Sequence, residues 1–378
     1  MKPKTERVKA SRRSRWRRFG LVIKLVVMSA LAMLAALVIW RVILQLMVDR
    51  KMAINSARGI DSLEPIRLGG IEQWITIRGR DRAKPLLVFL HGGPGFPQMP
   101  FDRLNADLEK HFVVVQWDQR GTGKSYSPSI PADSMRVAQF VSDAHELVEI
   151  LLKRFGAPKC YLVAHSWGSL VGALTVTKYP ELFYAYVGIG QVVSPPEMQQ
   201  VRYQYALDAA QKEQNTKALS ALRKIGRPPY ENFDDSEILD HWVKHYSRIE
   251  HTPVAPSKFV WLAFGSPAYS WADLARIARG VKFSFAQLWK EIFYQTNLFD
   301  QAPRIDVPVF FFHGRYDQVV TTQVTQRYFD GLDAPRGKQL IWFENSAHWP
   351  HFEEAQKYRD ELVNRVLLKT HSDVNEHD

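Results

Sequence analysis

The fold class is decided by the stretch KCYLVAHSWGS, residues 159–169. Its first half is a short apolar run typical of a buried strand, and a helical pattern begins directly after Ser166. Small residues flank this serine, Ala164 before it and Gly168 after it, and they let the backbone turn sharply from strand to helix. The pattern predicts a nucleophile elbow, a turn that exposes the serine hydroxyl at the end of a strand.

A serine hydroxyl becomes a useful nucleophile only beside a general base, which in turn needs an acid to orient it. After an elbow of this kind, the acid precedes the histidine in the chain. Asp317 and His348 keep that order, and each lies in a loop directly after an apolar strand pattern, at the edge where open α/β sheets place their sites. We predict that Ser166, Asp317 and His348 form a catalytic triad.

Other histidines and acids compete for these roles. His351 follows Pro350 and is expected to begin the final helix. Asp306 precedes its strand, at the wrong end for catalysis, and Asp300 lies in the approach to that strand. Three further histidines at strand ends are interpreted as hydrogen-bonding residues of loops or core: His91, His165 and His313.

A second glycine-rich loop, HGGPG at residues 91–95, directly follows the strand pattern 86–90. Glycines leave backbone N–H groups free to point at a developing oxyanion. We predict that the N–H groups of Gly93 and Trp167 form this hole, with Gly92 as the alternative donor. The loop has neither the spacing of a phosphate-binding P-loop nor its following Lys-Ser/Thr, and we expect no metal and no cofactor.

Around the elbow, short apolar runs alternate with helical patterns, which predicts a mostly parallel sheet covered by helices on both faces. Residues 66–71 and 73–77 are expected to form two strands around a Gly-Gly turn. Helices are predicted at 138–155 and 169–179, the latter stopped by Pro180. The buried strands are predicted at 85–90, 112–117, 159–164, 184–189, 307–312 and 340–343.

Between residues 192 and 303 the strand signal disappears, and this insertion between two strands predicts a helical cap. Its helices are expected at 198–211, 216–225, 236–249 and 284–294, with breaks at 226–229 and 253–256. Most of its aromatic residues are expected to form the core of the cap, and some to line an apolar substrate site: Tyr203, Tyr205, Tyr230, Trp242, Tyr246, Trp261, Phe264, Trp271 and Trp289.

The net charge of +11 over 378 residues raises the question of nucleic-acid or membrane binding. Residues 1–18 contain nine Lys or Arg and one acid, whereas residues 59–378 are nearly neutral at −1. Nucleic-acid binding is therefore not expected, because it needs basic charge on the folded part. The single cysteine, Cys160, excludes an internal disulfide and any zinc site built on several cysteines.

The basic segment runs into an apolar stretch ending at Val48, and residues 21–40 of it carry only one charge, Lys24. Twenty helical residues at about 1.5 Å each span about 30 Å, the thickness of the hydrocarbon core of a bilayer. A cleaved signal peptide is the alternative, but the stretch is long for one, so an uncleaved signal anchor is favoured. The positive-inside rule then places the N-terminus in the cytoplasm and the catalytic domain outside it.

Four motifs together resemble the α/β-hydrolase superfamily, and more closely its prolyl aminopeptidase (proline iminopeptidase) family. They are HGGPG at 91–95, DQRGTGKS at 118–125, SWGSL at 166–170 and GRYD at 314–317. The resemblance covers roughly residues 65–190 and 303–365 and implies the same triad by position. It implies an α/β-hydrolase fold with an inserted cap, and we interpret residues 118–125 as a structural loop that shapes the floor of the site.

The domain boundaries follow from these patterns. We expect a basic cytoplasmic tail at 1–18, a transmembrane signal anchor at 19–48, a linker at 49–64, an α/β-hydrolase core at 65–191 and 304–370, a helical cap at 192–303 and a polar tail at 371–378. The partners expected are a short peptide or small-molecule substrate and, through residues 19–48, a lipid bilayer.

The leading hypothesis is a membrane-anchored serine hydrolase that acts on peptides with a free N-terminus and a proline-like first residue. In the resembled family, acidic cap residues bind that free amino end. The candidates here match no motif of that family: Glu197, Glu213, Glu231, Asp234, Asp235 and Glu237.

The alternative is an esterase or amidase for small apolar or lipid-derived substrates, which the apolar cap and the neighbouring bilayer favour. Residues 349–354, WPHFEE, also look closer to small-molecule hydrolases of the superfamily. A non-catalytic binding module would be expected to lack a member of the triad, and all three residue types are present.

Overall fold

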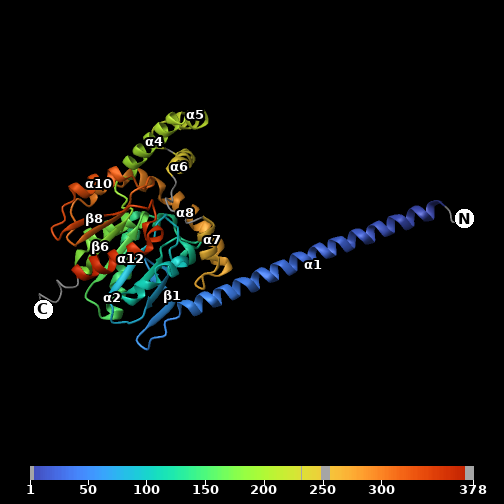
Figure 1. The fold of residues 1–378 in the computed structure, drawn as a ribbon, viewed down its shortest axis with the longest axis horizontal. Helices are drawn as coiled ribbons and strands as arrows, with labels where there is room; N and C mark the ends of the chain where they lie inside the picture. Colours follow the sequence, from blue (N-terminus) through green and yellow to red (C-terminus); the bar gives the residue numbers. More distant parts are fainter. Residues whose placement is uncertain (1–3, 231, 248–255, 371–378) are drawn as a thin grey trace.

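The alternation of apolar runs and helices produces one sheet of eight strands within the residues that the computed structural model describes, 4–230, 232–247 and 256–370 (Figure 1). The strands are β1 Ile60–Leu68, β2 Ile71–Gly79, β3 Leu86–Leu90, β4 Val113–Asp118, β5 Cys160–His165, β6 Phe183–Ile189, β7 Val309–Gly314 and β8 Lys338–Phe343.

The strand order across the sheet is β1-β2-β4-β3-β5-β6-β7-β8. β2 pairs antiparallel with β1 and with β4, and every other neighbouring pair is parallel. β3, β4, β5 and β7 are buried along their whole length, as their unbroken apolar runs predict. The prediction of a mostly parallel central sheet is confirmed.

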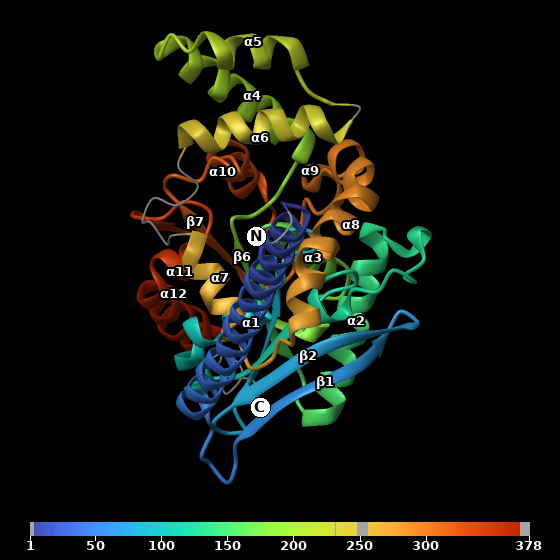
Figure 2. The same cartoon turned by 90° about the vertical axis from the view of Figure 1, so that its right-hand side faces the viewer.

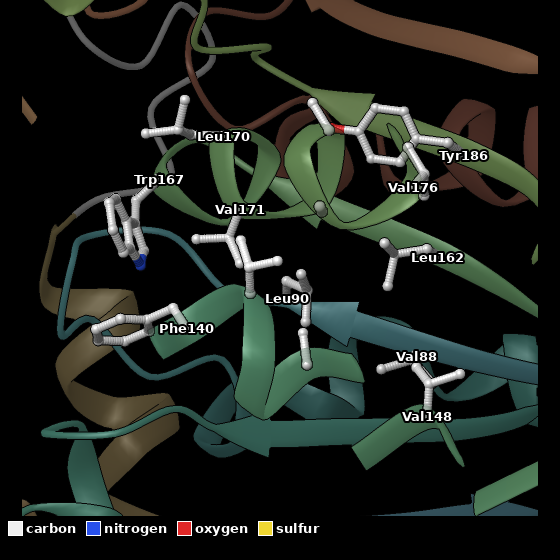
Figure 3. Packing of buried hydrophobic residues seen from close by; sticks show 14 of the residues in the cluster. Val88, Leu90, Phe140, Val148, Leu162, Trp167, Leu170, Val171, Val176 and Tyr186 are labelled. Carbon is white, nitrogen blue, oxygen red and sulfur yellow. The ribbon is translucent and has the colours of Figure 1, made fainter. Parts of the chain in front are cut away.

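Helices cover both faces of the sheet because successive side chains of a strand point to opposite faces. Val88 and Leu90 of β3 pack with α2 (Val137–Phe155) and α3 (Trp167–Lys178), and Figure 3 shows part of this cluster. Leu87 and Phe89 point the other way and pack with Tyr358 of α12 (Ala355–Glu361) and with the helical segment Leu362–Leu367.

The first hairpin is longer than predicted. β1 begins at Ile60 and α1 (Lys4–Met52) continues to Met52, so the segment predicted as a linker at 49–64 is largely a helix end and a strand. β1 is an edge strand whose exposed side chains alternate along it. Its polar residues and its proline, Pro65, therefore weaken the strand signal in the sequence.

A helical insertion lies between β6 and β7, where the sequence predicts a cap. Its helices are α4 Pro195–Lys212, α5 Thr216–Ile225, α6 Phe233–Ser247, α7 Pro256–Phe264, α8 Trp271–Gln295 and α9 Leu298–Gln301. α4, α5 and α6 form a lobe that projects from the body (Figure 1), and its core contains three of the predicted cap aromatics, Tyr203, Tyr230 and Trp242.

Two parts of the cap differ from the prediction. α7 and the first half of α8 occupy residues where the sequence pattern predicted no helix, and residues 248–249 of the helix predicted at 236–249 lie outside the described residues. α7 is apolar on nearly every side, so it shows no amphipathic period. α8 begins earlier because Ser270 and Asp273 form a capping box.

The N-terminal helix α1 projects from the body as a single long rod (Figure 1). Within the described residues, its part Phe19–Met52 is the one helix long and apolar enough to cross a membrane. The helix already begins at Lys4, so the basic segment predicted as a tail continues into it. The polar tail predicted at 371–378 lies outside the described residues.

Candidate active site

The serine of the predicted elbow stands between β5 and α3. Ser166 has a φ of +52° and a ψ of −122°, a backbone conformation that side-chain-bearing residues rarely adopt and that turns the chain abruptly. Gly168 allows the turn to approach the neighbouring strand end, because a Cβ there would lie 2.3 Å from the carbonyl oxygen of Leu90. The sequence pattern of small residues around the serine therefore has a direct steric cause.

Three predicted residues, which lie far apart in the sequence, form one hydrogen-bonded row. His348 Nε2 lies 3.0 Å from Ser166 Oγ, and His348 Nδ1 lies 2.9 Å from Asp317 Oδ2. Because the carboxylate accepts from Nδ1–H, Nε2 is left to accept the serine proton. This arrangement suits a nucleophile, a general base and an orienting acid.

Asp317 is fully buried, yet it stays ionised. Burial opposes its charge, but the electrostatic attraction and the hydrogen bond of the His348 ring outweigh burial and hold the pKa of this carboxyl below its usual value. Its other oxygen, Oδ1, accepts hydrogen bonds from the backbone N–H groups of Val319 and Val320, both at 2.9 Å. The loop after β7 thus fixes both oxygens of the acid.

The loop that carries His348 is held from two sides. The ring of His165 is buried, which lowers its pKa to about 3, and its neutral Nε2–H donates to the carbonyl oxygen of His348 at 2.9 Å. The carboxylate of Glu353 accepts from the N–H groups of Ala347 (2.8 Å) and Trp349 (2.9 Å), on either side of the histidine. Glu353 was not among the predicted residues, although an acid directly after a loop and in a first helical turn is a signal for such contacts.

The HGGPG loop lies against the elbow. A Cβ on Gly92 would lie 2.9 Å from His165 Nδ1 and 3.2 Å from Ser166 Cβ. His91 is buried and its pKa falls to about 4, so its ring is neutral. Nε2 accepts from the N–H of Gln119 (3.1 Å), and Nδ1–H donates to the carbonyl oxygen of Gly92 (2.8 Å). Since the C=O and N–H of a trans peptide point in opposite directions, this bond turns the N–H of Gly93 away from the His91 ring.

Gln119 connects three separate segments of the chain. Its side chain donates to the carbonyl oxygen of His91 (3.0 Å) and accepts from the indole N–H of Trp167 (3.1 Å). It therefore joins the segment after β4, the HGGPG loop and the first residue of α3. The motif DQRGTGKS gives no sign of this role in sequence alone, because both partners lie outside it.

The rest of residues 118–125 is held by buried polar contacts. Arg120 is fully buried and pairs with Asp143 of α2 at 3.0 Å. Burial raises the pKa of Asp118 to about 7, and this carboxyl accepts hydrogen bonds from the hydroxyl of Tyr269 and from the N–H of Lys124.

The helix α8 of the cap packs directly on the HGGPG loop and on the segment after β4. A Cβ on Gly95 would lie 2.8 Å from the carbonyl oxygen of Gly280, and a Cβ on Gly280 would lie 2.6 Å from the carbonyl oxygen of Gly121. The Oγ of Ser284 donates to the same oxygen of Gly121 at 3.3 Å. Backbone therefore touches backbone where the cap meets the loops.

The competing residues lie outside the row. Asp306 pairs with Arg304 on the surface, and Asp300 accepts from the side chain of Asn297. His351 lies buried in α11 (Pro350–Glu353) against Phe352. His313 is buried, which lowers its pKa, and its Nε2 lies 3.2 Å from the hydroxyl of Thr322, the first residue of α10 (Thr322–Gly331).

An aromatic cluster lies beside His348. The ring of Trp349 lies 5.0 Å from that of Phe259 in α7, and Phe259 lies 5.3 Å from Phe101. Phe96, next to the HGGPG loop, stacks on Phe101 at 5.8 Å. One face of α7 thus packs, through Phe259, into a buried aromatic cluster close to the predicted site.

Those acidic cap residues considered for an amino end that the structure describes do not gather at the row. Glu197 pairs with Arg327, and Asp235 accepts from Asn232. Three others are exposed on the α4–α6 lobe, and the last lies outside the described residues: Glu213, Asp234, Glu237 and, outside, Glu231.

A family assignment follows from the sequence match. Residues 85–355 match the family described as the alpha/beta hydrolase fold. The chain belongs to this family. As an α/β-hydrolase it is a hydrolytic enzyme, and the fold predicted from its motifs is confirmed.

Its α/β-hydrolase relatives include aminopeptidases. A protein of Bacillus subtilis named probable aminopeptidase YbaC is 33% identical over 82% of this chain and 97% of its own length. A proline iminopeptidase of Heyndrickxia coagulans is 27% identical over 72% of this chain and 87% of its own length. The resemblance to the proline iminopeptidases is thereby confirmed.

A solved structure agrees in fold. A membrane phospholipase A, described as a bacterial virulence factor, superposes with a TM-score of 0.61 and 19% identity, over 94% of this chain and 99% of its own. At that identity the likeness concerns the α/β-hydrolase fold alone.

Proposed function

We propose that this α/β-hydrolase is a membrane-anchored serine hydrolase of the aminopeptidase type. The observation that carries the proposal is the row Ser166–His348–Asp317, with both hydrogen bonds at 3.0 Å or less. Ser166 is the nucleophile, His348 the general base and acid, and Asp317 the residue that fixes the tautomer of His348.

The reaction proceeds in two halves. Ser166 Oγ attacks the carbonyl carbon of the substrate while its proton passes to His348 Nε2. The imidazolium then gives this proton to the leaving amine or alkoxide as the carbon–nitrogen or carbon–oxygen bond breaks, which leaves an acyl-enzyme. A water molecule loses its proton to His348 and attacks the acyl carbon, and the acid product departs as Ser166 regains its proton.

The negative oxygen of each tetrahedral intermediate is bound by the N–H groups of Gly93 and Trp167, with Gly92 as the alternative to Gly93. The bond from His91 to the carbonyl oxygen of Gly92 supports Gly93, because it sets the orientation of that peptide plane. Trp167 is the first residue of α3, where backbone N–H groups lack partners within the helix. A lost donor of this kind typically costs about 3–4 kcal/mol of transition-state stabilisation.

The substrates are peptides with a free N-terminus and a proline-like first residue, which the named relatives support. The second candidate is an esterase or amidase for small apolar or lipid-derived substrates. The buried aromatic cluster of Trp349, Phe259 and Phe101 beside His348 favours this candidate, because it makes the surroundings of the row apolar.

One substrate panel separates the two candidates. We expect the full chain in detergent to cleave proline anilide, and to cleave it faster than other aminoacyl anilides, because the relatives are proline iminopeptidases. Initial rates are measured beside short and long acyl esters, with the Ser166→Ala variant as the blank. Cleavage of esters with every anilide untouched would overturn the peptidase proposal and favour the esterase.

Anchoring is the remaining part of the proposal. Residues 19–48 of α1 cross the bilayer, and the nine basic residues among residues 1–18 keep the N-terminus in the cytoplasm. The catalytic domain is then extracytoplasmic. We expect alkaline phosphatase fused to the C-terminus, which folds actively only outside the cytoplasm, to be active. A fusion that works only with a cytoplasmic reporter would contradict this topology.

A further inference from the structure

The end of the uncharged segment 25–40 of α1 lies among aromatic residues of the cap. The ring of Trp40 lies 5.2 Å from that of Trp261 and 5.6 Å from that of Phe264, both in α7. Phe264 in turn lies 5.4 Å from Trp271, the first residue of α8. These four rings come from two parts of the chain more than two hundred residues apart and meet where α1 reaches the body.

Hydrogen bonds fix α1 to the cap at this level. Arg41 is 4% exposed, and its guanidinium donates to the carbonyl oxygens of Phe264 (3.0 Å) and Tyr269 (2.5 Å). The same guanidinium lies 4.5 Å from the ring of Trp271. One turn further on, the side-chain amide of Gln45 donates to the carbonyl oxygen of Ser266 at 2.7 Å. The guanidinium of Arg41, the first charge after residues 25–40, therefore finds its hydrogen-bond acceptors in the cap.

From Phe259 to Phe264 the helix α7 is apolar on its outer side as well as on its inner side, and its exposed charge, Lys258, lies in its first turn. Its inner face packs on the catalytic domain through Phe259 and Leu262. On the outer face, Val260 is 65% exposed and Trp261 49%, and the adjacent Trp271 is 45% exposed. A helix that is hydrophobic all round is normally buried in protein or in lipid, so this exposed side needs a partner.

We infer that this outer face, defined by Val260, Trp261 and Trp271, rests in the interface of the bilayer that α1 crosses. The inference depends on the proposed anchoring. Within the proposed anchor, residues 19–48, the part from Phe19 to Trp40 spans about 33 Å at about 1.5 Å per residue. This length matches the hydrocarbon core, so Trp40 lies at its boundary and residues 41–48 lie at the level of the headgroups. Tryptophan is enriched at that boundary, and Trp261 contacts Trp40, so α7 lies at the same depth.

The arrangement of the body agrees with a lipid partner. α7 and α8 lie on the side of the body from which α1 departs, and Figure 2 views this side, with α1 projecting toward the reader and α7 and α8 next to it. An interfacial helix buries its apolar face at the level of the headgroups. This face lies next to α1 at the level where α1 enters the membrane. The geometry therefore favours the bilayer as its occupant over a second copy or another protein.

The test places a nitroxide spin label at three positions of the full chain, one at a time, in phosphatidylcholine–phosphatidylglycerol vesicles. Val260→Cys carries the label on the outer face. Leu34→Cys carries it within the span, and Ile150→Cys carries it on α2, at a residue that is 38% exposed on another part of the body. The native Cys160 is fully buried and stays unlabelled. Relaxation of the label by oxygen reports lipid, and relaxation by a water-soluble nickel chelate reports water.

We expect oxygen to dominate at positions 34 and 260 and the nickel chelate to dominate at position 150, so the ratio of the two rates inverts between Val260→Cys and Ile150→Cys. An unchanged melting temperature shows that each labelled protein is folded. A label in lipid at 34 but in water at 260 overturns the inference and leaves the anchor intact. A label in water at 34 overturns the anchor itself, and with it the inference. A label at 260 shielded from both reagents means that protein covers the face, which also overturns the inference.

Discussion

Replacing Ser166 with alanine is expected to lower kcat by about 10⁴- to 10⁶-fold, because the change removes the only atom that forms the acyl-enzyme. The substitution should change the stability of the fold only slightly. Ser166 Oγ makes its hydrogen bond to His348, and losing one such bond typically changes the free energy of unfolding by about 1 kcal/mol. Initial rates on the best substrate of the panel and a thermal melt measure the two effects.

A fluorophosphonate probe gives a second reading of the same change. It should form one covalent adduct on the wild-type chain, located by mass spectrometry on the peptide that contains Ser166, and none on Ser166→Ala. The matched control is Ser129→Ala, an exposed serine whose loss should leave both the rate and the adduct unchanged. A Ser166→Ala variant that retains a tenth of the wild-type kcat would show that another residue is the nucleophile.

Replacing Asp317 with asparagine is expected to lower kcat by about 10⁴-fold through the tautomer of His348. The N–H groups of Val319 and Val320 hold Oδ1, so the asparagine keeps its oxygen there and presents its NH₂ group to His348 Nδ1. That group donates rather than accepts, and it therefore forces the imidazole proton onto Nε2. Nε2–H can no longer take the proton of Ser166.

The control for this variant is Asp306→Asn. Asp306 is the acid at the opposite end of the same strand, and it pairs with Arg304 on the surface. Surface pairs contribute little, so kcat and the melting temperature should stay near wild type. If Asp317→Asn and Asp306→Asn gave similar rates, Asp317 would be a structural residue of its loop and the proposed triad would lose its acid.

The central sheet and the hydrogen-bonded row were predictable because their signals are local. Strands buried on both faces leave unbroken apolar runs, and the elbow leaves small residues around Ser166 at fixed spacing. Asp317 and His348 each follow a recognisable strand, and a parallel sheet brings the carboxyl ends of its strands to one edge. Sequence order and topology were therefore enough to select these residues from their competitors.

The contacts that position the site were not predictable in the same way. Gln119 bonds to His91 and Trp167, which lie 28 and 48 residues away, and no short motif contains all three. Edge strand β1 was predicted too short, because its outward side chains are polar. α7 was missed because a helix that is apolar on both sides has no period to detect.

The contact of Gly280 with Gly95 and Gly121 limits how the cap can open. At these points backbone lies on backbone, and interiors packed this closely transmit displacement instead of absorbing it. A hinge motion of α8 away from the body would displace the HGGPG loop and the segment after β4. It would break the hydrogen bonds between His91 and Gln119. Substrate entry that keeps those hydrogen bonds must therefore use motions of the α4–α6 lobe, while α8 keeps its place on the two loops. Within the cap, α8 is therefore the fixed element and the α4–α6 lobe is the part that is free to move.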